Sequence, residues 1–161
     1  MMAPLPPRTV LVVDDEEIVR TLVSRALRTA GYRVEEATHG LAGLAVLESG
    51  SVPIDLVVCD LVMPALNGRD LARWITLHYP GLPILFISGY PLPYLEAHDL
   101  HDPTIPLLRK PFLPSRLLES VEEALAMVGG LKSTVEEPRT KGHRGLLSPP
   151  FVSFRSGRDP D

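Results

Sequence analysis

The stretch Val10-Leu11-Val12-Val13-Asp14-Asp15 contains the pattern that decides the fold of this chain. Four consecutive aliphatic residues, three of them β-branched, are typical of a parallel strand that is covered on both faces. Two carboxylates follow, and an apolar stripe at spacings of three and four then begins at Ile18 and stops at Gly31. This stripe indicates an amphipathic helix. The stretch therefore predicts a buried strand, an acidic strand end and a helix that returns across the sheet.

The same alternation of a short apolar strand and a helix recurs four more times along the chain. Strands are expected over 32–37, 54–59, 84–87 and 105–108. The accompanying helices are expected over 41–47, 69–78, 94–100 and 117–128. Five such units in about 120 residues predict an α/β fold, with a parallel sheet and helices on both of its faces. Spacing alone leaves the order of the strands open.

Composition and charge exclude several classes of function. Of the 161 residues, 45% are hydrophobic and 22% charged, which is enough apolar content for a folded core. The formal net charge of −4 disfavours nucleic-acid binding through a broad basic face. The single cysteine excludes an intramolecular disulfide and a thiolate zinc cluster. Since the sequence also shows neither a signal peptide nor a membrane-length apolar run, we expect a cytoplasmic protein without membrane insertion.

A change in charge and periodicity predicts a domain boundary after residue 128. Residues 1–128 carry ten basic and sixteen acidic side chains, hence a net charge of −6; residues 129–161 carry six and four, hence +2. The apolar periodicity stops at Gly129-Gly130, and four prolines follow. We expect a folded domain over 8–128 and a disordered tail over 129–161.

Polar side chains stand at the carboxyl ends of the predicted strands. Asp14 and Asp15 follow the first strand, Asp60 the third, Ser88 the fourth and Lys110 the fifth. In doubly wound sheets these ends meet at one edge, where ligands bind. Carboxylates crowded there repel one another, and a hard cation such as Mg²⁺ relieves the repulsion.

These residue types together predict a Mg²⁺-dependent phosphoryl site. Lys110 is the only lysine of the predicted domain, and an ammonium can contact a phosphoryl oxygen without a fixed fork geometry. Ser88 supplies a hydroxyl donor for the same group. Positioning and charge neutralisation supply most of the catalysis in phosphoryl transfer, and a carboxylate can accept the phosphoryl group covalently. Taken singly, each group has an ordinary structural explanation; their coincidence at the strand ends favours function.

Four motifs carry these residues: 10–16 (VLVVDDE), 55–64 (DLVVCDLVMP) followed by Asn67-Gly68, 86–90 (FISGY) and 110–112 (KPF). In this order and at this spacing, they resemble the receiver domain of two-component response regulators, and in particular the chemotaxis receivers. The resemblance covers 8–128. It implies a flavodoxin-like, doubly wound, five-stranded parallel sheet in the order 2-1-3-4-5. It also implies a cis peptide bond between Lys110 and Pro111.

The resemblance implies a role for each acidic residue. Asp60 would become an aspartyl phosphate, with the phosphoryl group taken from a sensor histidine kinase or a histidine phosphotransfer protein. Asp14, Asp15, Asp60 and the backbone carbonyl of Val62 would bind Mg²⁺ or Mn²⁺. The downstream protein target stays unknown, and direct nucleic-acid contact is not expected.

One position departs from the family pattern. The resemblance implies that Lys110 contacts the phosphoryl group and that Ser88 turns inward to hydrogen-bond it. Three residues before the lysine, the family usually has an aromatic residue that moves with this hydroxyl, but this chain has Leu107. We therefore expect a weaker readout or a different one. The stretch Ser88-Gly89-Tyr90-Pro91 resembles receivers that are joined to hybrid sensor kinases.

The expected function is that of a single-domain response regulator, which is a phosphorylation-driven binding switch and not an enzyme with a separate substrate. Self-phosphorylation and autodephosphorylation would be its only chemistry. One alternative is a non-phosphorylated pseudo-receiver, and another is a receiver that acts within a hybrid-kinase phosphorelay. A Mg²⁺-dependent phosphatase is a third, but its usual second acid is replaced here by Val62.

Other conspicuous residues are assigned to the core. By period, Ile18, Val19 and Leu22 are mainly core residues of the first helix, although part of this helix could face a kinase. Cys59 is expected to be a buried apolar residue. Trp74 is expected to anchor the third helix.

Overall fold

The alternation of strands and helices produces one parallel sheet, seen in a computed structural model that describes residues 4–132. The strand order is β2-β1-β3-β4-β5. The strands are β1 (Thr9–Val13), β2 (Arg33–Ala37), β3 (Leu56–Asp60), β4 (Ile84–Ser88) and β5 (Leu107–Arg109). Every neighbouring pair is parallel, so the expected flavodoxin-like, doubly wound fold is confirmed.

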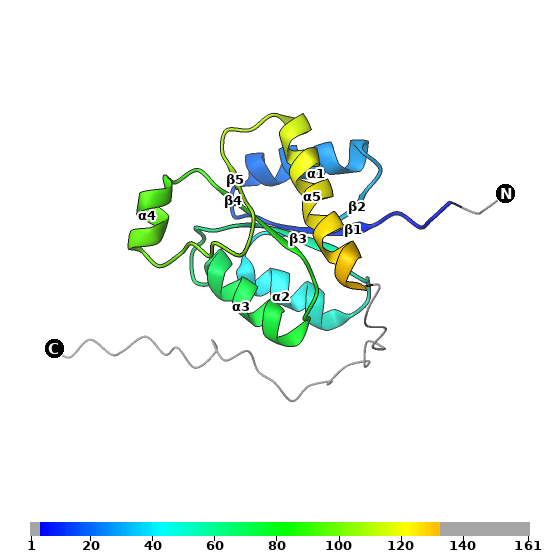
Figure 1. Cartoon of the computed structure of the whole chain (residues 1–161), viewed down its shortest axis with the longest axis horizontal. Coiled ribbons are helices and arrows are strands. Elements are labelled where there is room, and N and C mark those ends of the chain that lie inside the picture. Colours follow the sequence, from blue (N-terminus) through cyan, green and yellow to red (C-terminus); the bar gives the residue numbers. More distant parts are fainter. Residues whose placement is uncertain (1–3, 133–161) are drawn as a thin grey trace.

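Helices cover both faces of this sheet (Figure 1). On one face lie α1 (Glu17–Thr29) and α5 (Pro114–Lys132), and on the other lie α2 (Gly40–Ser49) and α3 (Gly68–His78). The short helix α4 (Leu92–Ala97) lies at the periphery of the molecule. The structure therefore has three layers, as the five β/α units predict.

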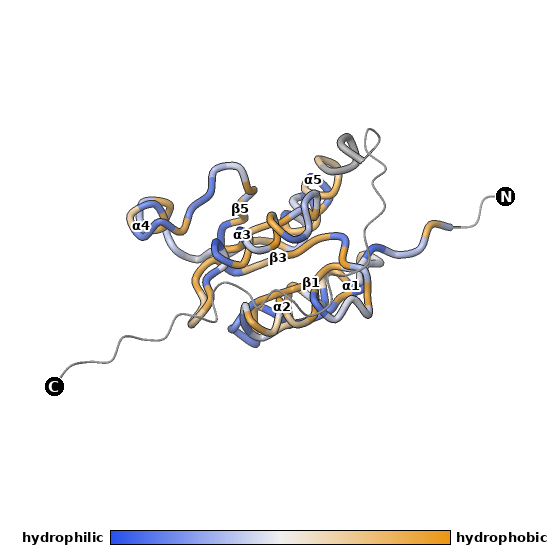
Figure 2. The backbone as a smooth tube through the Cα atoms, turned by 90° about the horizontal axis from the view of Figure 1, so that it is seen from below, coloured by the Kyte–Doolittle hydropathy of each residue, from blue (hydrophilic) through white to orange (hydrophobic). Residues whose placement is uncertain are grey.

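Two apolar clusters form the core, one on each side of the sheet. Leu11 and Val13 of β1 join the cluster under α2 and α3, whereas Val10 and Val12 join the cluster under α1 and α5. All residues of β1, β3 and β4 are buried. Figure 2, which is coloured by hydropathy, shows that β1 and β3 consist largely of hydrophobic residues (orange). Continuous aliphatic runs occur here because both strand faces are covered.

Several elements begin or end within a few residues of their predicted bounds. β3 begins two residues late because Asp55 uses its carboxylate to accept a hydrogen bond from the backbone N–H of Thr9. β5 begins after Pro106, which has no N–H for the sheet. Helix α4 begins at Leu92 and not at residue 94, since proline is tolerated in a first turn. It ends before Asp99, whose φ is 55°.

The prediction that Ile18 and Leu22 belong to the core is wrong. Their side chains are 76% and 59% exposed, and α1 packs on the sheet through Val23 and Leu27. Ile18 precedes half-buried Val19 by one residue, which is a rotation of about 100° around the helix axis and turns Ile18 away from the sheet. The apolar stripe of α1 is thus wider than the part of the helix that contacts the sheet. In contrast, the predicted burial of Cys59 and Trp74 is confirmed.

Helix α5 continues through Gly129 and Gly130 to Lys132, four residues beyond the boundary expected after residue 128. A glycine in a helix costs about 1 kcal/mol relative to alanine, which does not by itself end a helix. The rest of the expected tail, 133–161, lies outside the described residues. Within the described residues, none of the helices combines the length and the hydropathy that crossing a membrane requires.

Candidate functional site

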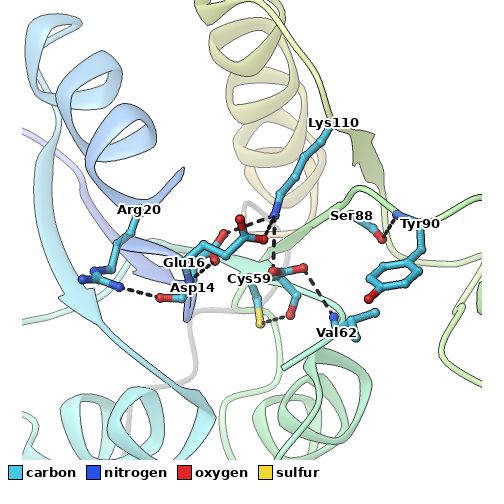
Figure 3. Close-up of polar contacts among 9 residues, drawn as sticks. Asp14, Glu16, Arg20, Cys59, Val62, Ser88, Tyr90 and Lys110 are labelled. Atoms are coloured by element: carbon cyan, nitrogen blue, oxygen red, sulfur yellow. Dashed lines mark hydrogen bonds and ion pairs between the residues drawn. The ribbon is translucent and has the colours of Figure 1, made fainter. Parts of the chain in front are cut away.

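The strand ends bring the predicted side chains to one edge of the sheet (Figure 3). Asp14 directly follows β1, Asp60 ends β3, Ser88 ends β4, and Lys110 directly follows β5. The register explains why they meet, since Val13 is paired with Cys59, Asp60 with Ile87, and Ser88 with Arg109. Residues that are distant in sequence thus lie in one row along the edge.

Three carboxylates form a compact acidic cluster at this edge. Asp14 and Asp60 are buried and Asp15 is exposed, and one carboxylate oxygen from each lies within 4.8 Å of the others. The backbone N–H of Glu16 donates to Asp14 Oδ1 at 2.9 Å, and that of Val62 donates to Asp60 Oδ1 at 3.3 Å. Closely grouped carboxylate oxygens are the ligands of a hard divalent cation, so the donor set fits Mg²⁺.

Burial makes negative charge unfavourable in this cluster. Burial and the neighbouring Asp14 raise the pKa of Asp60 to about 6, even though Lys110 acts in the opposite direction. Burial likewise raises the pKa of Asp14. Both shifts show that the carboxylates lack sufficient compensating positive charge within the protein, and a bound dication would supply it.

Lys110 lies among three carboxylates. Its Nζ is 3.3 Å from Asp60 Oδ2, 3.4 Å from Glu16 Oε1 and 3.7 Å from Asp14 Oδ2. Burial alone would lower the pKa of Lys110, but Asp60, Asp14 and Glu16 together raise it. The peptide bond between Lys110 and Pro111 is cis, as the resemblance implies. The contact of Glu16 was not predicted, and its only signal in the sequence is its place directly after Asp15.

The start of α3 holds the end of β3 in place. A Cβ atom at Gly68 would lie 2.5 Å from the backbone oxygen of Asp60, so only glycine permits this close approach. The backbone N–H of Gly68 donates to Leu61 O at 2.9 Å. Asn67 caps the helix, because its Oδ1 accepts a hydrogen bond from the N–H of Asp70 at 2.9 Å. The Asn67-Gly68 motif therefore positions Asp60.

Ser88 is connected to an aromatic stack on α4. Its Oγ accepts a hydrogen bond from the backbone N–H of Tyr90 at 3.1 Å, and Pro91, not Ser88, occupies the N-cap position of α4. The ring of Tyr90 stacks on Tyr94 at 4.7 Å between centroids, and Tyr94 stacks on His98 at 4.0 Å. A continuous row of rings thus leads from the site to the C-terminal end of α4.

A pocket of about 430 Å³ opens at the same edge. It is lined by the charged residues Asp15, Asp60 and Lys110, and also by Pro64 and Tyr90. Leu107, at the position where the family usually has an aromatic residue, is half-buried and packs against the core under α2 and α3. The pocket therefore opens beside both Asp60 and Lys110.

Comparison with protein families and curated proteins gives consistent results. Residues 10–122 match the family model described as response regulator receiver domain. The chain is 37% identical over 117 residues to the sensor kinase CckA of Brucella abortus, covering 73% of this chain but only 12% of CckA. It is 30% identical over 118 residues to the response regulator receiver protein CpdR of the same species, covering 73% of this chain and 97% of CpdR.

Solved structures show the same likeness. The receiver domain of the hybrid histidine kinase CckA matches with a TM-score of 0.61 and 32% identity, covering 73% of this chain and 98% of that one. A response regulator receiver protein from Sinorhizobium medicae matches with a TM-score of 0.67 and 31% identity, covering 76% and 97%.

Proposed function

The chain belongs to the response regulator receiver domain family, and we propose that it acts as a single-domain response regulator phosphorylated on Asp60. The observation that carries this proposal is the setting of Asp60. Its carboxylate is buried at the end of β3, lies 3.3 Å from Lys110 Nζ, and stands beside Asp14 and Asp15. The phosphoryl donor would be a phosphohistidine on a sensor histidine kinase or on a histidine phosphotransfer protein.

In the proposed transfer, a carboxylate oxygen of Asp60 forms a bond to phosphorus as the bond between phosphorus and the histidine nitrogen breaks. The nitrogen keeps the electron pair of that bond. Lys110 Nζ, already beside Asp60 Oδ2, would pair with the phosphoryl oxygens, and Ser88 Oγ would donate to them. Asp14, Asp15, Asp60 and the carbonyl of Val62 would hold Mg²⁺, which when bound neutralises charge on the phosphoryl oxygens.

The exposed residues of α1 support docking of the phosphohistidine partner. Ile18 and Leu22 expose their apolar side chains, and α1 begins at Glu17, two residues after Asp15 of the acidic edge. A partner that covers this surface would bring its histidine near Asp60. The exposure of Ile18 and Leu22 is therefore part of the proposed function.

We propose that α4 reports the state of Asp60, since Leu107 has no aromatic ring to do so. We propose that Ser88 turns toward the phosphoryl group, which would move its Oγ away from the backbone N–H of Tyr90, from which it accepts a hydrogen bond at 3.1 Å in the unphosphorylated protein. The ring of Tyr90 is stacked on that of Tyr94, so a movement of Tyr90 after the loss of this hydrogen bond would also displace α4. The pseudo-receiver alternative predicts instead that no donor modifies Asp60.

A second candidate is a receiver that works inside a hybrid-kinase phosphorelay. The identity of 37% to the sensor kinase CckA favours it, whereas the match over 97% of CpdR favours a stand-alone receiver. Both candidates use the same acceptor and the same class of donor. They differ in which protein receives the phosphoryl group next.

Small phosphodonors test the proposed acceptor. We expect acetyl phosphate with Mg²⁺ to modify the wild type, and Asp60→Asn to remove the modification, as measured by phosphate-affinity electrophoresis. Asp102→Asn is the matched control, because Asp102 lies in the loop after α4 and, among the described residues, its carboxylate accepts hydrogen bonds only from Thr104. Modification of Asp60→Asn at the wild-type rate would contradict the assignment. A wild type that no donor modifies would favour the pseudo-receiver.

A further inference from the structure

Glu16 is an acid of the site that neither the acceptor role nor the proposed metal ligands account for. Its Oε1 lies 3.4 Å from Lys110 Nζ, and Figure 3 shows its carboxylate turned toward that ammonium. Unlike Asp14 and Asp60, which are buried, the side chain of Glu16 is 62% exposed. It can therefore move away from Lys110 without any rearrangement of the core.

Lys110 is shared between carboxylates in this state of the protein. An ammonium has three N–H donors, and Asp60, Glu16 and Asp14 all lie within 3.3–3.7 Å of Nζ. A phosphoryl group on Asp60 needs donors from the same ammonium. Because the phosphoryl group and Glu16 are both anionic, they compete for Lys110 and also repel each other.

We propose that Glu16 is a restraining acid, which holds Lys110 in the unphosphorylated state and lowers the occupancy of the phosphorylated one. This inference rests on the proposed function of Asp60. Glu16 acts through Lys110 and touches no reacting atom, so it is a positioning residue. It sets how strongly the site takes up a phosphoryl group, and it leaves the identity of the acceptor unchanged.

The proposal predicts effects of opposite sign for a cation and for a phosphoryl analogue. Removing the charge of Glu16 takes one negative charge from the neighbourhood of a bound dication, so Mg²⁺ should bind more weakly. The same change frees Lys110 and reduces repulsion, so beryllofluoride, an analogue of the phosphoryl group, should bind more tightly once Mg²⁺ is saturating. A variant that merely damages the site would weaken both.

Calorimetric titration of the full chain with Mg²⁺, and then with beryllofluoride at saturating Mg²⁺, tests this. For Glu16→Gln we expect beryllofluoride affinity to rise roughly two- to fivefold, the range for a partly exposed ion pair. Mg²⁺ affinity should fall by a smaller factor. The matched control is Glu17→Gln, which removes an equal charge from the next residue, exposed in the first turn of α1 and without a contact to Lys110 among the described residues.

The salt dependence of binding gives an independent readout. The difference in beryllofluoride affinity between Glu16→Gln and the wild type should shrink toward none as the ionic strength rises, because salt screens the interaction of exposed charges. Glu17→Gln should bind both ligands like the wild type. The proposal is overturned if Glu16→Gln binds beryllofluoride no more tightly than the wild type. It is also overturned if Glu17→Gln shows the same increase in beryllofluoride affinity as Glu16→Gln. A wild type that binds no beryllofluoride at all would instead contradict the proposed function itself.

Discussion

At the scale of single residues, the site depends on charges that the protein alone does not neutralise. Asp60 has a pKa of about 6 because it is buried and lies beside Asp14, and the single ammonium of Lys110 does not offset both effects. A bound dication would offset this unfavourable negative charge, and the proposed phosphorylation of Asp60 requires such an offset because it adds further negative charge.

Gly68 is the residue whose substitution should disturb Asp60 without changing any charge. In Gly68→Ala, the new Cβ would lie 2.5 Å from the Asp60 backbone oxygen, so the end of β3 or the start of α3 must shift. We expect a loss of about 1–3 kcal/mol in the free energy of unfolding, as for overpacked sites. Urea denaturation measures it.

Gly43→Ala is the control for that substitution. The three atoms nearest to its Cβ would all belong to side chains, namely the two methyl groups of Val13 at 3.0 and 3.5 Å and the Cβ of Ala37 at 3.9 Å, and alanine favours the helical conformation of α2. We expect a smaller loss than for Gly68→Ala. Equal stability of the two variants would mean that the contact between Gly68 and Asp60 carries no constraint.

At the scale of elements, α4 is the helix with the fewest anchors in the core. It has one buried residue, Leu95, and its end is held by Arg69 of α3. The Arg69 guanidinium donates to the backbone oxygen of Asp99 at 2.6 Å and forms an ion pair with its carboxylate. Such an element can change position without loss of the sheet.

Tyr90→Leu should uncouple α4 from the site. In the wild type, beryllofluoride with Mg²⁺ should change the amide chemical shifts of Lys110 and of the residues of Leu92–Ala97 other than Pro93, which has no backbone N–H. In Tyr90→Leu, the changes at Lys110 should remain, whereas those along α4 should be reduced, because the ring that stacks on Tyr94 is gone. Nuclear magnetic resonance spectra of the two proteins give the comparison.

Tyr79→Leu makes the same chemical change after the end of α3, where Tyr79 OH donates to Leu47 O of α2. It should leave the response of α4 intact. An unchanged α4 response in Tyr90→Leu would show that the aromatic stack does not carry the signal.

At the scale of the whole molecule, the sequence predicts most of the sheet. The run at Val10–Val13 and the acidic or basic strand ends follow from local patterns, because burial on both faces requires aliphatic residues there. Strand order comes from contacts between distant segments, so spacing left it open and only the family resemblance implied it. The exposure of Ile18 and the contact of Glu16 with Lys110 also depend on tertiary packing, which helical periodicity does not encode.

The stability of the whole fold should depend on pH through Asp60. Its pKa of about 6 lies above the ordinary value of 3.8 that it has when unfolded, so the native protein binds the proton more tightly. The stability that this proton contributes is therefore present below about pH 4 and lost as the pH rises through 6. Asp14 acts in the same direction.

The substitution Asp60→Asn should remove this loss of stability at neutral pH, because asparagine carries no charge. Without Mg²⁺ at pH 7, we expect the variant to be about 1–3 kcal/mol more stable than the wild type, since one pKa unit corresponds to about 1.4 kcal/mol. Near pH 4 the two proteins should be similar, and Mg²⁺ should stabilise the wild type more than the variant. Thermal denaturation of both proteins between pH 4 and pH 7 measures this difference in stability. If the difference grew toward low pH, the upward direction of the Asp60 pKa shift would be contradicted.

The central claim is that Asp60 is the phosphoryl acceptor, and chemical mapping of the phosphorylated residue tests it most directly. Borohydride reduces an aspartyl phosphate to homoserine, which peptide mass spectrometry locates in the sequence. After treatment with acetyl phosphate and Mg²⁺, we predict homoserine at position 60 alone. Homoserine at Asp14 or Asp15, with none at position 60, would contradict the account.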